Sequence, residues 1–191
     1  DWSSDVCSSD LIANGATFRF NTTVSQTLAG SIIGPGTFQK LGSGTLAMTG
    51  AGTYTGATTV SEGGLSMTTA HTGGGAATVA AGARLGVTVA GALDSQLTLS
   101  SLGLGNASGL TIDLASFGNP SLAPLKVLGG ITTSGASTVI NFSTGAPSAG
   151  TIPLVSYGSL NAYNFTLGTL PAGMSASLVN NTRSEEHTSE L

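Results

Sequence analysis

The stretch GPGTFQKLGSGTLAMTGAGTYTGATTVSEGGLSM, residues 34–67, carries the most regular pattern in the chain. Two glycines separated by one residue recur with a spacing of eight, at Gly34/Gly36, Gly42/Gly44 and Gly50/Gly52. Between these pairs, apolar and polar residues alternate, which is the pattern of a strand that buries one face. Glycine permits bends and close approach of backbones, so each unit predicts a short strand followed by a tight turn.

A longer period links this stretch to the next one. A pattern of one Val, one Gly and two apolar residues occurs twice, at an offset of about 20 residues and with one inserted residue in the second copy: Val60, Gly63, Leu65, Met67, then Val79, Gly82, Leu85, Val87. A fixed period of this length indicates a solenoid whose coils are built from short strands and bends. The alternatives are a β-sandwich and a jelly roll, which predict hairpin turns and no repeat of coil length.

The remainder of the chain is also predicted to be β-structure. Helical periodicity is absent, and Glu, Lys and Gln are scarce, whereas Thr and Val suit a pleated surface. The predicted strands are 37–41, 44–49, 57–61, 64–68, 76–80, 84–89, 96–100, 110–114, 125–128, 137–142, 151–157, 164–167 and 175–179.

The 34–67 stretch resembles the autotransporter-associated β-strand repeat, also called the passenger-associated transport repeat. The matching positions are Gly34, Gly36, Lys40, Gly42, Gly44, Thr45, Leu46, Gly50, Tyr54, Gly56, Thr58, Val60, Gly63 and Leu65. Phe38 replaces a Leu of the family pattern, and Gly52 replaces the usual Asn. The resemblance implies a right-handed parallel β-helix (β-solenoid) that assists passenger export and carries no active site.

The two ends of the chain resemble a translated sequencing adapter. The first eleven residues, DWSSDVCSSDL, and the last nine, RSEEHTSEL, correspond to one oligonucleotide read in its two orientations. We therefore expect residues 1–11 and 183–191 to be adapter-derived tails, which removes Cys7 and His187 from the candidate functional residues. On this interpretation the protein is an internal fragment.

Between the tails, two regions are expected. Residues 12–115 form the β-solenoid, with the repeat at 34–67, and residues 116–182 form a β-rich continuation or C-terminal cap, or a small sandwich. Within the second region, PLVSYGSLNAYNFTLGTLPAGMSASLVNN resembles the segment that often follows the last such repeat in long secreted bacterial proteins. A cap is expected because an open solenoid end presents unpaired backbone groups.

Sparse charge excludes several function classes. Outside the tails, four basic residues face three acidic ones, a net charge of +1: Arg19, Lys40, Arg84 and Lys126 against Glu62, Asp94 and Asp113. A nucleic-acid interface needs clustered Lys and Arg, so none is expected. The mean hydropathy is +0.30, yet Gly, Ser and Thr interrupt every apolar stretch, so no membrane insertion of this fragment is expected.

Few residues qualify as site candidates. Glu62, Asp94 and Asp113 are the acids available for acid–base catalysis, and they are distant from one another in sequence. His71 has no Cys or acid beside it to complete a metal site. We therefore predict no catalytic, cofactor-binding or metal-binding residues and no cofactor.

The aromatic side chains near the C-terminus admit two interpretations. Tyr157, Tyr163 and Phe165 would stack on sugar rings if exposed on one face, but they would fill the core of a cap if buried. We favour the core interpretation.

The sequence thus favours a non-catalytic scaffold or stalk of a secreted or surface-displayed autotransporter-like passenger, which supports adhesion. The alternatives are a fragment of a polysaccharide-active β-helix enzyme and a carbohydrate-binding module that uses the C-terminal aromatics. Clustering of Glu62, Asp94 and Asp113 in one groove would favour the enzyme. The expected location is the outside or surface of a Gram-negative-type bacterium. Host or matrix glycans or proteins and neighbouring solenoid coils of a longer chain are the expected partners.

Overall fold

The computed structural model describes residues 9–135, 137–143, 147–162, 164–181 and 186–190. Two large sheets dominate it. The 10-stranded sheet contains β2 (Thr17–Asn21), β5 (Thr37–Leu41), β7 (Thr58–Val60), β9 (Ala77–Val79), β11 (Leu97–Leu99), β12 (Leu102–Leu104), β14 (Leu125–Thr133), β16 (Thr151–Leu160), β18 (Ser177–Asn181) and β19 (Glu186–Glu190). The 7-stranded sheet contains β3 (Gln26–Leu28), β6 (Thr45–Met48), β8 (Gly64–Thr68), β10 (Arg84–Thr88), β13 (Gly109–Asp113), β15 (Thr138–Phe142) and β17 (Phe165–Leu167). A two-stranded sheet pairs β1 (Ser9–Leu11) with β4 (Ser31–Ile33).

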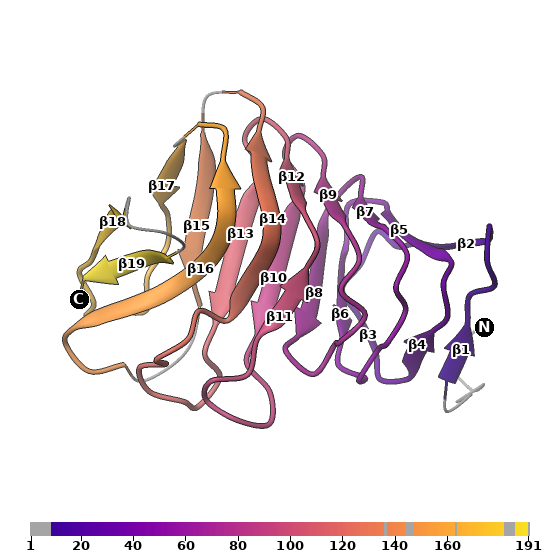
Figure 1. Cartoon of the computed structure of the whole chain (residues 1–191), viewed down its shortest axis with the longest axis horizontal. Coiled ribbons are helices and arrows are strands. Elements are labelled where there is room, and N and C mark those ends of the chain that lie inside the picture. Colours follow the sequence, from indigo (N-terminus) through magenta and orange to yellow (C-terminus); the bar gives the residue numbers. More distant parts are fainter. Residues whose placement is uncertain (1–8, 136, 144–146, 163, 182–185, 191) are drawn as a thin grey trace.

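The chain winds through these sheets as a parallel β-solenoid (Figure 1). From β5 to β10, successive strands alternate between the two large sheets, and each strand pairs in parallel with its counterpart in the next coil. Phe38 pairs with Phe18 in the preceding coil and with Thr58 in the following coil. The all-β solenoid expected from the sequence is confirmed.

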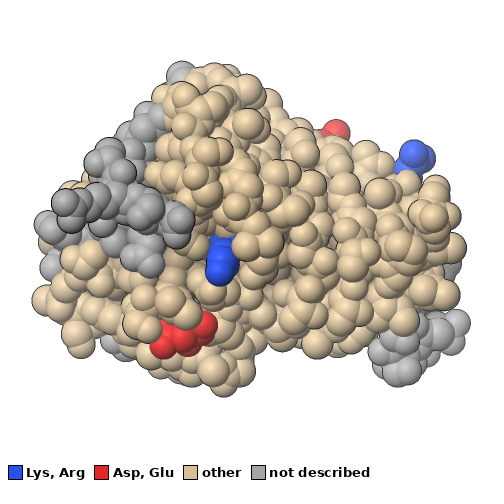
Figure 2. All heavy atoms as spheres, in the orientation of Figure 1, with Lys and Arg blue, Asp and Glu red and all other residues tan. Residues whose placement is uncertain are grey.

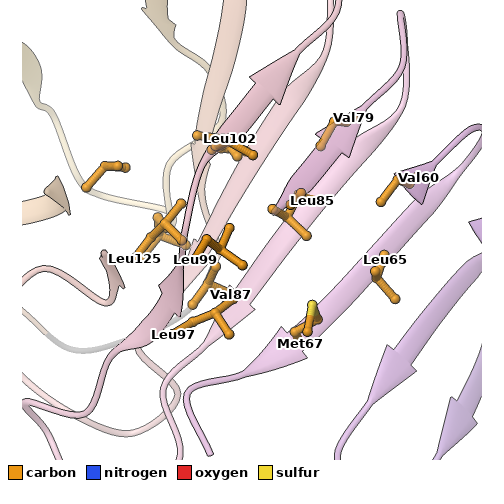
Figure 3. Packing of buried hydrophobic residues seen from close by; sticks show 14 of the residues in the cluster. Val60, Leu65, Met67, Val79, Leu85, Val87, Leu97, Leu99, Leu102 and Leu125 are labelled. Carbon is orange, nitrogen blue, oxygen red and sulfur yellow. The ribbon is translucent and has the colours of Figure 1, made fainter. Parts of the chain in front are cut away.

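Apolar side chains from successive coils align inside the solenoid (Figure 3). One interior row of the 7-stranded sheet consists of Leu46, Leu65, Leu85, Leu110 and Ile140, and all five are buried. Side chains within the row are thus covered by their equivalents in the adjoining coils, which removes apolar surface from water.

The pattern of Val, Gly and two apolar residues that occurs twice in the sequence corresponds to successive coils of the solenoid. Val60 pairs with Val79 and Leu65 with Leu85, although one more residue separates the second pair of positions along the chain. Gly82 has a φ of 72°, in the left-handed region that favours glycine. The inserted residue is therefore absorbed in the bend, and the pairing on both sides stays in register.

All thirteen predicted strands are present, with starts that differ from the observed ones by at most two residues, and the strands that were not predicted are informative. The sequence pattern did not predict four strands in the body: β2, β3, β4 and β12. β12 lies in a stretch rich in Ser and Gly, which is typical of a turn, yet Leu102 and Leu104 point inward and are buried. Its short pattern becomes a strand because β9 and β14 flank it on both sides.

The solenoid continues after residue 115 with longer coils. Asn119 and Ser148, which form hydrogen bonds across adjacent coils, are 29 residues apart in the chain. Near the N-terminus, Thr17 and Thr37 form the equivalent kind of contact and are only 20 residues apart. β14 is a long strand whose first part pairs with β11 and whose last part pairs with β12. β16 is also long and pairs with both parts of β14, and the register of this pairing shifts just after Val127. Beyond β17, β18 and β19 pair antiparallel with each other, and β19 with β16.

Asparagine side chains join these longer coils. The amide of Asn119 donates to the carbonyl of Ser148 and accepts from its N–H, at 3.0 and 2.8 Å. The side-chain oxygen of Asn141 accepts from the N–H of Thr169 at 2.9 Å. Such side chains satisfy backbone groups that the wide bends leave outside the strand ladders.

Candidate functional site

Lys40 is the residue whose environment is least expected. It follows Phe38 by two positions on β5, so its side chain points into the core between those of Phe20 and Val60 in the adjoining coils. It is completely buried. Its Nζ donates to the carbonyls of Leu41 and Gly42, both at 2.7 Å, and lies 3.5 Å from the carbonyl of Glu62 in the next coil.

These contacts make Lys40 a cap for the bend. Burial lowers the pKa of its ammonium group, and the nearby carboxylate of Glu62 opposes that shift. Buried carbonyl oxygens left without a donor are costly, and the ammonium group supplies donors to carbonyls of two coils. The role that follows from this geometry is to close a bend and tie one coil to the next.

An aromatic column runs beside Lys40 through four coils. The ring centroids of Phe18 and Phe38 are 5.8 Å apart, those of Phe38 and Tyr54 6.0 Å, and those of Tyr54 and His71 4.6 Å. The Tyr54 hydroxyl lies 2.6 Å from the hydroxyl of Thr58. Burial raises the pKa of Tyr54 to about 12, with the hydrogen bond to Thr58 opposing the shift.

His71 ends this column as a core residue. The sequence predicts a loop residue, and His71 does lie outside the strands, but only 4% of its surface is exposed. A Cβ at Gly52 would overlap Nδ1 of His71, so the small residue at position 52 leaves room for the imidazole. The sequence signal for this arrangement was Gly52, which replaces the Asn of the family pattern. Its role becomes clear only from the position of His71 in the neighbouring coil.

The acidic candidates do not form a catalytic pair. Glu62 lies just before β8, whereas Asp113 is the last residue of β13. Since these strands are parallel members of one sheet, the two acids lie at opposite ends of it, at least about 13 Å apart, the rise of the four residue steps of β8 at 3.3 Å per residue. Paired carboxylates of glycosidases lie closer than this.

Asp94 is engaged in holding a loop. Its carboxylate accepts hydrogen bonds from the hydroxyl of Ser121 at 2.8 Å and from the N–H groups of Ser121 and Leu122 at 2.7 and 3.2 Å. The hydrogen bonds from Ser121, the side-chain one first, lower the pKa of Asp94. A carboxylate held in its ionised form suits structure better than general acid catalysis.

The aromatic candidates near the C-terminus differ from one another. Phe165 is buried in the core, and Tyr157 is half-buried and packs against the same core. Tyr163 lies outside the described residues. Among the residues described, no group of three His, Cys, Asp or Glu side chains could hold a metal ion, and no helix is long and apolar enough to cross a membrane.

The regular part of the solenoid has a counterpart among known families. Residues 38–67 match the sequence profile of the passenger-associated-transport-repeat. This segment is such a repeat. No curated protein matches the chain.

The motif residues of the passenger-associated-transport-repeat have structural roles in this chain. Gly36, Gly56 and Gly75 lie one above another at a bend: a Cβ at Gly56 would overlap the carbonyl oxygen of Gly36, and one at Gly75 would overlap that of Gly56. Lys40 closes the following bend. The repeat is thus a set of residues that lets coils stack closely, and its characteristic side chains are used within the fold.

Within the aromatic column, His71 makes stability dependent on pH. Burial lowers the pKa of His71 from 6.5 to about 4, so between these values the unfolded chain binds a proton that the folded chain resists. Stability is therefore expected to fall as pH drops from about 6.5 to about 4, by at most about 3 kcal/mol. Urea unfolding at pH 7.5 and pH 4.5 measures this loss.

The variant His71→Gln is the control for this pH effect. It removes the titrating group but leaves every carboxylate and His187 unchanged. The extra loss seen in the parent chain should vanish in the variant. An equal loss in both proteins would mean that His71 is not the group responsible.

Proposed function

We propose that this chain is a non-catalytic scaffold segment of a secreted or surface-displayed autotransporter passenger from a Gram-negative-type bacterium, a stiff stalk that supports adhesion. The observation that carries the proposal is the way the repeat merges into two continuous parallel sheets. Within the described residues, three of its chemistry-bearing side chains are used for structure: Lys40 at a bend, His71 in the core and Asp94 in a loop.

The surface supports the same role. The face shown in Figure 2 is almost entirely uncharged, with only isolated basic and acidic side chains. In a stack of coils, a charge repeated at one position would lie above its own copy and repel it. Low charge therefore suits a structure whose coils repeat at about 5 Å.

Incomplete burial of aromatic side chains in the first coil supports the proposal that neighbouring solenoid coils of a longer chain are partners. β2 and β3 are the end strands of their sheets. Phe18 and Phe20 point into the core from β2 but are only half-buried, whereas Phe38, one coil later, is completely buried. A preceding coil of a longer passenger, stacked on β2 and β3, would bury both rings and pair the free strand edges.

A deletion of one whole coil tests the stalk role. Removing residues 38–57 brings Thr58 opposite Phe18 and preserves the register of both sheets. With the chain placed between an export signal and an outer-membrane anchor, surface protease accessibility and fibre length are measured. A stalk shortened by one coil should still be displayed.

The control deletion removes residues 48–57, half a coil, which brings non-equivalent positions together. This variant should lose protease resistance. Loss of display after the in-register deletion as well would count against a spacer whose coils are interchangeable.

A further inference from the structure

A shallow trough lies on the outer face of the 7-stranded sheet, over β8, β10 and β13. Its cavity volume is about 180 Å³, and it is open to solvent along one side. Its lining includes the outward side chains of Thr45, Ser66, Arg84, Thr88, Thr111 and Asp113. The scaffold role makes no use of this hollow.

Missing side chains create the trough. Gly86 stands in an outward row between Ser66 and Thr111, and Gly64 precedes Arg84 in the neighbouring row. A Cβ at Gly86 would come 3.2 Å from Oγ of Ser66, so a larger side chain would occupy the floor. The glycines thus leave a recess bordered by hydroxyl groups.

Arg84 supplies a positioned cation at one end. Its stem lies over Gly109, where a Cβ would come 3.3 Å from Cγ of Arg84. Within the described part of the chain, its guanidinium makes no hydrogen bond or salt bridge. A guanidinium without a partner can bind a carboxylate through two parallel hydrogen bonds.

The opposite end of the trough is acidic. Asp113 pairs with Thr88, four residues beyond Arg84 on β10, so the backbone positions of the two charged residues are about 13 Å apart along the strands. Oδ1 of Asp113 also accepts the N–H of Ala115 at 2.7 Å. A ligand that spans the trough therefore meets a cation first, then hydroxyl groups, then a carboxylate.

These features select the class of ligand. The strands under the trough are paired on both sides, so an extended peptide cannot add to them as a further strand. The described residues that line the trough include no aromatic side chain and are mostly hydroxyl-bearing residues and glycines. Hydroxyl groups of a sugar chain can both donate to and accept from these side chains.

We propose that this trough binds an acidic polysaccharide whose carboxylates are spaced by neutral sugars, with one carboxylate on Arg84 and neutral units over Ser66, Thr88 and Thr111. The proposal goes beyond the scaffold role and is tested independently of it, on binding rather than on display. Affinity per site is weak because no ring is stacked, and repeated display on a surface raises the avidity.

Calorimetric titration tests the proposal on the full chain. The probe is a hyaluronan tetrasaccharide, in which glucuronate alternates with a neutral sugar, and uncharged chitotetraose is the comparison. Saturable binding of the acidic probe alone is expected. Arg84→Gln should weaken it roughly tenfold or more, because a charge-assisted contact is lost. Absence of saturable binding, or equal binding of chitotetraose, would overturn the assignment.

Two further variants locate the binding site. Gly86→Thr fills the floor of the trough and should reduce binding as strongly as Arg84→Gln, with the thermal midpoint measured to verify folding. Arg19→Gln removes an arginine on β2, in the other sheet, and should leave binding unchanged. Equal effects of Arg19→Gln and Arg84→Gln, or full binding by a folded Gly86→Thr protein, would refute the trough as the site.

Discussion

Gly56→Ala is expected to destabilise the solenoid by about 2–4 kcal/mol, which is large for the addition of one methyl group. The added Cβ would overlap the carbonyl oxygen of Gly36 and come 2.5 Å from its carbon. Both atoms belong to the backbone of the adjoining coil, so relief requires the coils to separate and their hydrogen bonds to lengthen. The free energy of unfolding from urea denaturation measures the effect.

Substitutions at two other glycines distinguish the effect of steric overlap from the effect of backbone conformation. Gly118 has open space around the added atom and no left-handed φ, so Gly118→Ala should change stability by less than about 0.5 kcal/mol. Gly82 also has open space but a φ of 72°, so Gly82→Ala should cost about 1 kcal/mol from strain alone. If Gly56→Ala cost no more than Gly82→Ala, close stacking of the coils would not explain the motif.

Lys40→Ala is the second substitution with a large expected effect, a loss of about 3–4 kcal/mol. It leaves a cavity between Phe20 and Val60 and removes the donor from the carbonyls of Leu41 and Gly42. Thermal and urea unfolding measure the loss. Hydrogen exchange should rise at the N–H groups around this bend and in β7.

Lys40→Met separates the two causes, since methionine fills most of the space but donates no hydrogen bond. Its expected loss is about 1–2 kcal/mol, because removal of the buried charge offsets part of the lost hydrogen bonding. A Met variant as unstable as the Ala variant would assign the whole effect to the hydrogen bonds. A stable Ala variant would contradict the bend-capping role.

Neighbouring residues in the chain were enough to predict much of the fold. Period-two alternation located strands such as β5 and β8, whose predicted bounds are those observed. The Val–Gly–Leu echo identified the coil repeat, because Val60/Val79 and Leu65/Leu85 pair as the offset predicts. Such patterns can be recognised in the sequence because each coil buries the same positions as the previous one.

The sequence was a poorer guide to which polar side chains point into the interior of the solenoid. Alternation along β5 places Lys40 on the same face as Phe38, but a charged residue normally argues for the solvent side. Its carbonyl partners include one 22 residues away. His71 is similar, because the ring that it contacts belongs to Tyr54 in the preceding coil.

The sequence by itself determined the class of structure, the strand-and-bend rhythm and the family of the repeat at residues 38–67. Tertiary structure alone decided which charges are buried, how the acids lie relative to one another, and where Gly64 and Gly86 open a trough beside Arg84. The physical reason is that these properties depend on contacts between coils, whose partners lie far apart in the chain, for example 20 residues for Thr17 and Thr37 and 30 residues for Ser108 and Thr138. Their register follows from the summed length of every bend between them, which no local pattern specifies.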